Sequence, residues 1–283
     1  MGVLAGVRST GGFNLTRAAN AALELIEPRG CCYPIWETEA ELNLEICLDN
    51  YESLVNAVRG GADRIELCAS LSEGGLTPPV SFIEAALRLD VPIFVMIRPR
   101  SCDFLYTSDE LEMMHRDIRT ARELGAPGVV LGVLTASGEI DRTAMRSLIK
   151  EAGGMDVTCH RAVDQVKDIF AAVDTLAELG VKRMLSSGQA RTAFEGIDVL
   201  AQLVAYSKGR IGIIAGAGVT PANVRRIVTG AKVDEVHSAA AVIRPSAMAY
   251  TRTDALMGNG RDFRLEVVDE EKVRQLRTQL RGL

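Results

Sequence analysis

The stretch LEICLDNYESLVNAVRGGADRIELC, residues 44–68, indicates the fold class. It contains two short β-rich runs, Leu44–Leu48 and Arg64–Cys68, and the helical pattern between them stops at Gly60-Gly61. In both runs the aliphatic side chains alternate with other residue types, which is typical of a strand with two different faces. A strand, a helix and a second strand of the same kind favour a βαβ unit with parallel strands.

The same unit recurs through the rest of the chain. Each predicted strand ends about 20 to 35 residues after the previous one, a supersecondary repeat period. Eight such units in one chain predict a parallel sheet that closes on itself. We therefore expect one α/β domain over residues 43–283, a single (β/α)8 TIM barrel. The predicted strands are Leu44–Leu48, Arg64–Cys68, Ile93–Arg98, Val129–Val133, Val157–His160, Arg183–Ser187, Ile211–Ala215 and Glu235–Ser238.

One helix carries an especially clear start and stop signal. Thr107 and Glu110 have the spacing of a capping box for a helix that begins at Ser108. Gly125 stands where a left-handed residue ends such a helix, and Pro127 follows it.

Composition narrows the function classes. The 283 residues include 32 Lys and Arg against 37 Asp and Glu, so nucleic acid is not an expected partner. No apolar run is long enough for a transmembrane helix, and no membrane partner is expected. Nothing resembles a secretory signal, so the six cysteines are expected to be reduced thiols in a cytoplasmic protein.

Residues 1–42 differ from the rest of the chain. Up to Leu23 they contain Arg8 and Arg17 but no acidic residue, which only weakly resembles a mitochondrial transit peptide. We favour a flexible N-terminal extension or a gene-model artefact over that reading. Cys31 and Cys32 form a thiol pair within this segment.

Deleting this N-terminal segment should leave the melting temperature nearly unchanged, because a segment outside the core contributes little to stability. Thermal unfolding of the shortened chain checks this, and a large drop would place the extension in the core.

The predicted barrel interior is unusually polar. Alternation directs Glu45 and Cys47 inward from the first strand, and Glu66 and Cys68 inward from the second. The same phase turns Cys159 outward, toward the helices. Structural barrels instead fill their interior with branched aliphatic residues. The other inward polar residues are Arg64, Arg98, Thr158, His160, Glu235 and His237.

Two interpretations fit these buried polar groups. Buried charges are costly unless they are paired, so an internal salt-bridge network, for example Glu45 with Arg98, is one of them. The other is a functional site, because the groups cluster at strand C-termini, where barrel enzymes carry their active sites. We expect the network to exist, and we favour a site as well. It is predicted to place Glu45, Arg98, His160 and His237 in one solvent-reachable pocket.

Several segments resemble the CutC family, from about Leu44 to the end of the chain. They are Arg64-Ile-Glu-Leu-Cys68, Glu73-Gly-Gly-Leu-Thr-Pro78, Ile97-Arg-Pro-Arg100, Asp103-Phe-Leu-Tyr106, Cys159-His-Arg-Ala162, Ser187-Gly188, Ala215-Gly-Ala-Gly218 and Glu235-Val-His-Ser238. The resemblance implies a barrel that assembles as a homo-oligomer, a dimer or a tetramer. It also implies a role in copper homeostasis, with Cu(I) bound by Cys47 and Cys68. Cys102 stands where the family commonly has glycine, and it could compete for the metal.

A second function stays open from the residues themselves, an enzyme of lyase, isomerase or hydrolase type. Its substrate would be a small anionic or phosphorylated compound, held partly by Gly216 and Gly218 after the seventh strand. Arg98 and Arg100 could clamp the anion. In this reading Glu45, His160 and His237 take part in proton transfer. The remaining anion-binding candidates are Asp103, Ser187 and Ser238.

Overall fold

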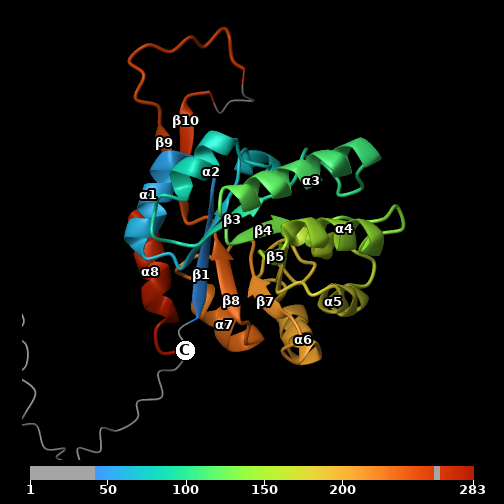
Figure 1. The fold of residues 1–283 in the computed structure, drawn as a ribbon. Coiled ribbons are helices and arrows are strands. Elements are labelled where there is room, and N and C mark those ends of the chain that lie inside the picture. Colours follow the sequence, from blue (N-terminus) through green and yellow to red (C-terminus); the bar gives the residue numbers. More distant parts are fainter. Residues whose placement is uncertain (1–41, 258–261) are drawn as a thin grey trace, which may run out of the picture. The chain divides into compact units, whose positions relative to one another are not determined.

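The computed structural model describes residues 42–257 and 262–283. Figure 1 shows a ring of strands surrounded by helices. The predicted N-terminal extension, with Cys31 and Cys32, lies outside the described residues except for Leu42.

Eight parallel strands close into a barrel in the order β1 to β8, which confirms the predicted fold (Figure 1). Every predicted strand overlaps an observed one, with ends that differ by at most two residues. Each strand hydrogen-bonds to its neighbours in sequence, and β8 closes the ring against β1. The strands are β1 Asn43–Leu48, β2 Arg64–Leu67, β3 Ile93–Met96, β4 Gly128–Leu131, β5 Asp156–Cys159, β6 Arg183–Ser186, β7 Gly212–Ala215 and β8 Glu235–Ser238.

Helices follow the strands and cover the outside of the barrel. The capping box predicted from Thr107 and Glu110 is present at the start of α3, and Gly125 follows this helix with a left-handed φ of 87°. The helices are α1 Tyr51–Gly60, α2 Val80–Ala86, α3 Ser108–Glu123, α4 Arg142–Ala152, α5 Ile169–Glu178, α6 Ile197–Ser207, α7 Val224–Ala231 and α8 Glu270–Leu280. Two short 3-10 helices, Leu71–Glu73 and Arg161–Gln165, lie in the loops after β2 and β5.

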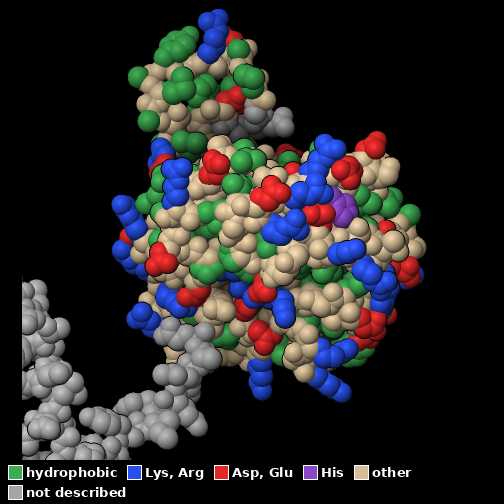
Figure 2. Space-filling model, viewed as in Figure 1, with side chains coloured by type: hydrophobic (Ala, Val, Ile, Leu, Met, Phe, Trp, Pro, Cys, Tyr) green, Lys and Arg blue, Asp and Glu red, His purple; other side chains and the backbone are tan. Residues whose placement is uncertain are grey.

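An antiparallel hairpin interrupts the last strand–helix unit, which the sequence analysis did not predict. Its strands, β9 Ala241–Pro245 and β10 Arg264–Val268, project from the barrel (Figure 1). Figure 2 shows hydrophobic side chains gathered on this projection. The exposed large hydrophobic residues between β8 and α8 are Ile243, Met248, Tyr250, Leu256, Met257 and Leu265.

The core has two parts, as the strand phases predict. A large cluster, which includes Cys159, fills the space between strands and helices. A small cluster of Cys68, Phe94, Met96 and Val130 lies inside the barrel. The outward phase of Cys159 and the inward phase of Cys68 are therefore confirmed. Within the described residues, no helix combines the length and apolarity that a membrane span requires.

Candidate functional site

Charged side chains fill the N-terminal end of the barrel. Arg64 forms ion pairs with Glu45 and Glu235. Arg183 bridges Glu235 at 3.0 Å and Asp156 at 2.8 Å. These five residues, here called the floor network, are therefore linked by ion pairs.

The ring of Phe94 lies between the two arginines of the floor network. The guanidinium carbons of Arg64 and Arg183 are 5.0 and 5.1 Å from the ring centroid, within the range of cation–π contacts. Gly128 on β4 makes room for this ring, since a Cβ at that position would lie 2.6 Å from it. Packed side chains thus fill the N-terminal end of the barrel.

The predicted salt-bridge network exists, but the pairing of Glu45 with Arg98 was wrong. The strand register sets Glu45 beside Arg64 on one side and His237 on the other. Arg98 lies nearer the C-terminal end and donates to the carbonyl oxygens of Glu73, Gly75 and Cys102.

A cavity of about 630 Å³ lies above the floor network, at the C-terminal ends of the strands. Arg98, His160 and His237 all line it, as predicted, whereas Glu45 is fully buried beneath His237 and does not. The lining residues are Cys47, Glu66, Leu71, Gly74, Met96, Arg98, Cys102, Phe104, His160, Arg161, Asp164, Gln165, Leu185, Gln189, Ala190, Ala217, Gly218, His237, Ser238, Ala239 and Glu266.

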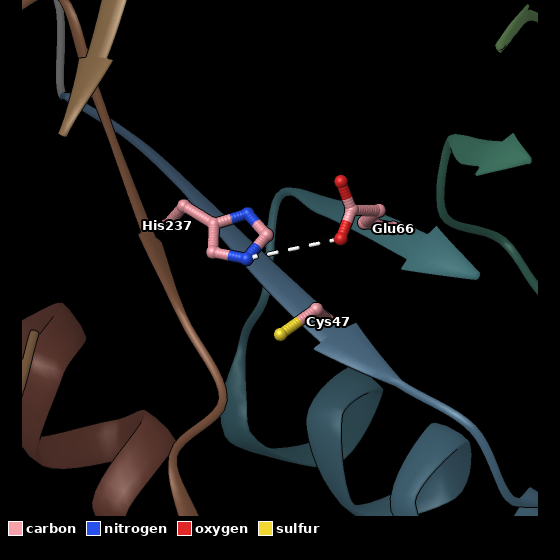
Figure 3. Close-up of side chains that lie close together, drawn as sticks. All are labelled: Cys47, Glu66 and His237. Atoms are coloured by element: carbon pink, nitrogen blue, oxygen red, sulfur yellow. Dashed lines mark ion pairs between the residues drawn. The ribbon is translucent and has the colours of Figure 1, made fainter. Parts of the chain in front are cut away.

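Cys47, Glu66 and His237 form one side of this cavity, here called the thiol wall. They come from three neighbouring strands, β1, β2 and β8, and their side chains converge (Figure 3). One potential metal-binding atom from each lies within 4.8 Å of the others. Sequence analysis directed Glu66 inward but did not count it as a ligand candidate. The register, in which Glu66 lies beside Cys47, brings it there.

Two carboxylates fix the orientation of the imidazole in the thiol wall. His237 Nδ1 is 2.7 Å from Glu45 Oε1, and its Nε2 is 3.8 Å from Glu66 Oε2 (Figure 3). Buried Glu45 thus holds the ring from below and leaves Nε2 toward the cavity.

Burial and charge act in opposite directions on these groups. Burial lowers the pKa of His237, but Cys47, Glu66 and Glu45 outweigh it and hold this pKa well above its usual value. Burial raises the pKa of Glu45, yet the bond to His237 and the charge of Arg64 lower it to about 2. Burial raises the pKa of Glu66 to about 7 against the charge of His237.

Cys68 is more completely buried than Cys47. It is fully buried and does not line the cavity, and its Sγ is 3.6 Å from Glu66 Oε2. Burial, followed by the charge of Glu66 and the proximity of Cys47, raises the pKa of the Cys68 thiol. Cys47 is therefore the more accessible of the two predicted copper ligands.

Arg98, Phe104 and His160 form a second side of the cavity, here called the arginine wall. Phe104 lies between the other two, 4.9 Å from the His160 ring centroid and 5.0 Å from the Arg98 guanidinium carbon. Only 5% of Arg98 and 4% of His160 is exposed. Among the residues that the structure describes, no carboxylate lies within ion-pair distance of Arg98.

The tautomer of His160 follows from its contacts. Its Nδ1 accepts a hydrogen bond from the backbone N–H of Ala162 at 3.2 Å. Burial, aided by the charge of Arg98, lowers the pKa of His160 to about 3, so the ring is neutral and carries its proton on Nε2. Gly132 makes room for this ring, because a Cβ there would lie 2.7 Å from His160 Cε1.

The buried neutral state of His160 predicts a pH-dependent stability. In the unfolded chain His160 takes up a proton below about pH 6.5, whereas in the folded chain it stays neutral down to about pH 3. Protons therefore favour the unfolded state, and the parent loses roughly 1 kcal/mol per pH unit from this group between those values. His160→Asn should lose less, as measured by urea unfolding at pH 6.5 and 4.5. Equal losses in the two proteins would contradict the assignment.

Asp164 is a site residue that the sequence analysis did not identify. Its carboxylate accepts from Ser186, Ser187, Gln189 and Arg161, and so ties the loop after β5 to the loop after β6. The only sequence signal is its position four residues after His160, at the end of β5. Its role here is to fix the two loops.

Two of the predicted anion-binding residues lie away from the cavity. Arg100 pairs with Asp103 at 3.0 Å and with Glu110 at 2.6 Å, and neither Arg100 nor Asp103 lines the cavity. The expected clamp of Arg98 with Arg100 is therefore wrong, because Arg100 is bound to acids at the start of α3.

Of the other candidates, Gly218 and Ser238 line the cavity, whereas Ser187 and Gly216 do not. Ser187 donates to Asp164 and to the carbonyl of Ala190. A Cβ at Gly216 would lie 2.5 Å from Leu185, so close packing explains this glycine.

The closed barrel, with a cavity at the carboxyl ends of its strands, defines the protein as a TIM barrel whose candidate site lies at the face where TIM-barrel enzymes carry their active sites. Phosphoribosyl anthranilate isomerase from Thermococcus kodakaraensis shares the fold, with a TM-score of 0.54, 16% identity, and coverage of 86% of this chain and 100% of that one. At this identity the similarity concerns the fold alone.

Closer relatives identify the family. The model of the CutC family matches residues 42–242. The CutC family protein of Photobacterium profundum is 45% identical over 235 residues, which cover 82% of this chain and 96% of that protein. A human copper homeostasis protein cutC homolog is 44% identical over 237 residues, 82% of this chain and 87% of that protein. The crystal structure of CutC from Streptococcus agalactiae has a TM-score of 0.67 and 33% identity, covering 70% of this chain and 98% of that chain. This chain belongs to the CutC family.

Proposed function

We propose that this protein serves copper homeostasis by binding Cu(I) at the thiol wall, with Cys47 as the anchoring ligand. The observation that carries the proposal is the convergence of Cys47, Glu66 and His237 within 4.8 Å at the cavity surface. Human and mouse relatives that are 44% identical are described as copper homeostasis proteins, which supports copper as the metal.

The donor atoms suit Cu(I). Thiolate sulfur is the ligand that Cu(I) prefers, and imidazole nitrogen also binds copper well. A carboxylate oxygen is a harder ligand, so Glu66 is better suited to accept a proton or a hydrogen bond from a neighbouring ligand. We assign the first two coordination positions to Cys47 Sγ and His237 Nε2.

Cys68 supplies a second thiolate in this proposal. Cys68 directly follows Leu67, the register partner of Leu48, and its sulfur lies 3.6 Å from Glu66 Oε2. The proximity of Cys47 contributes to the raised pKa of this thiol. Burial disfavours its thiolate, but binding of a cation beside it would reverse that preference. With a metal ion bound to Cys47, Cys68 would thus become available as a second thiolate ligand.

X-ray absorption of the reduced protein, loaded anaerobically with one equivalent of Cu(I), tests the ligand set. Cys31, Cys32 and Cys102 are replaced by serine so that only barrel thiols contribute. We expect stoichiometric binding with both sulfur and nitrogen scatterers, and a loss of the nitrogen signal in His237→Phe. Oxygen or nitrogen scatterers without sulfur, or no stoichiometric binding, would refute the site.

A further inference from the structure

The arginine wall carries a feature that copper binding does not use. Arg98 is a buried cation that donates hydrogen bonds to three main-chain carbonyls, and His160 Nε2–H is a buried donor with no partner in the described part of the chain. Neither group offers a free lone pair to Cu(I), because Arg98 is a cation and His160 Nε2 carries the proton of a neutral ring whose Nδ1 already accepts a hydrogen bond. A buried charge without a counter-ion is costly, and an unmatched buried donor adds to that cost.

We propose that the arginine wall binds the anionic oxygens of a small organic carboxylate or phosphate, with Arg98 supplying charge and His160 Nε2–H a directed hydrogen bond. The shared anion would compensate both groups at once. Phe104 contacts both side chains and so helps to keep them in place. This site does not depend on copper binding at the thiol wall.

Three acids line the cavity, Glu66, Asp164 and Glu266, and among the described residues none of them forms an ion pair with Arg98. Asp164 already accepts from two serine hydroxyls, two backbone N–H groups and Arg161. Glu66 belongs to the thiol wall, where it faces His237. Arg98 therefore has no carboxylate competing for its charge within 4.0 Å among the described residues.

The apolar residues that line the cavity indicate what the rest of the ligand is like. Leu71, Met96, Phe104 and Leu185 give the cavity apolar surface next to the polar donors. A volume of about 630 Å³ is of the size that holds a small organic molecule. The ligand class is thus a compact organic acid or phosphate ester with a short carbon skeleton.

Nitrogen-15 NMR of the imidazole groups tests the proposal directly, because the chain has only three histidines. Inorganic phosphate, pyruvate and 2-phosphoglycolate are titrated separately into the copper-free protein at constant ionic strength. We expect at least one to shift the His160 Nε2 signal in a saturable way. His115 is the internal control: it lies on α3, contacts Ser147 of α4, and does not line the cavity. Its signal should not move.

The three probes separate the ligand sources: phosphate alone, carboxylate alone, or both on one skeleton. Arg98→Met should weaken the effective probe at least tenfold, whereas Arg100→Gln, two residues away and outside the lining, should leave it unchanged. The parent titration decides even if Arg98→Met fails to fold. No saturable shift of His160 with any probe, equal shifts at His115, or unchanged binding in a folded Arg98→Met would overturn the proposal. Cu(I) binding by the same samples reports separately on the thiol wall.

Discussion

Cys47→Ser is expected to produce the largest loss of Cu(I) affinity of any single substitution in the barrel. Losing a residue that only supports a metal ligand typically costs about 10- to 100-fold in affinity. Removal of the anchoring thiolate should cost more than that, because serine offers a hard, protonated oxygen in its place. Anaerobic competition against a chromophoric Cu(I) chelator measures the change. Cys68→Ser should also weaken binding sharply, since it removes the second thiolate.

Two matched controls accompany these cysteine variants. Cys159→Ser changes a buried thiol on the outer face of β5, within the core between strands and helices, and should leave Cu(I) affinity unchanged. His160→Ala alters the arginine wall alone and should also leave it largely intact. If Cys47→Ser and Cys68→Ser both bind Cu(I) like the parent, the thiol wall is not a copper site.

Arg64→Met is expected to cause the largest loss of stability. The arginine is 5% exposed and neutralises Glu45 and Glu235 in the floor network. Its pKa is raised, because those two carboxylates outweigh the burial that would lower it. Removing one partner of a buried ion pair leaves the remaining charges buried without an opposite charge, at a cost of about 3–5 kcal/mol. Urea unfolding measures the change in the free energy of unfolding.

A surface arginine and a compensated variant sharpen this test. Arg142 pairs with exposed Glu178 on the outside of the barrel, and Arg142→Met should cost at most about 1 kcal/mol. Adding Glu45→Gln and Glu235→Gln to Arg64→Met should recover part of the lost stability, because the stranded charges are then removed. A loss equal to that of Arg142→Met would show that the floor network contributes little.

Strand positions and phases could be predicted because they depend on local patterns. Alternation in Leu44–Leu48 and Arg64–Cys68 is enough to direct Glu45, Cys47, Glu66 and Cys68 inward, and helix-stopping glycines set the spacing. The capping box of α3 depends on four consecutive residues and was equally accessible. The hairpin of β9 and β10 was missed because it lies within what was read as one more strand–helix repeat.

Neighbours inside the barrel could not be predicted in the same way. Closing a sheet staggers its strands, so residues with the same phase on different strands lie at different heights. Phase alone left Glu45 free to meet Arg98, whereas the register places it beside Arg64 and His237. The same stagger sets Glu66 beside Cys47, and it explains why an acid was absent from the predicted ligand set.

Within the described residues, the floor network fills the N-terminal end of the barrel, so a ligand would reach the cavity from the C-terminal face. A metal ion at the thiol wall and an anion at the arginine wall would then have to pass through this face one after the other. A resident anion should then slow the departure of Cu(I) as well as its arrival, even where the equilibrium affinity is unaltered. Copper would leave fastest to an acceptor that reaches in from the loop-bearing face, so transfer by direct docking would outpace release into solution.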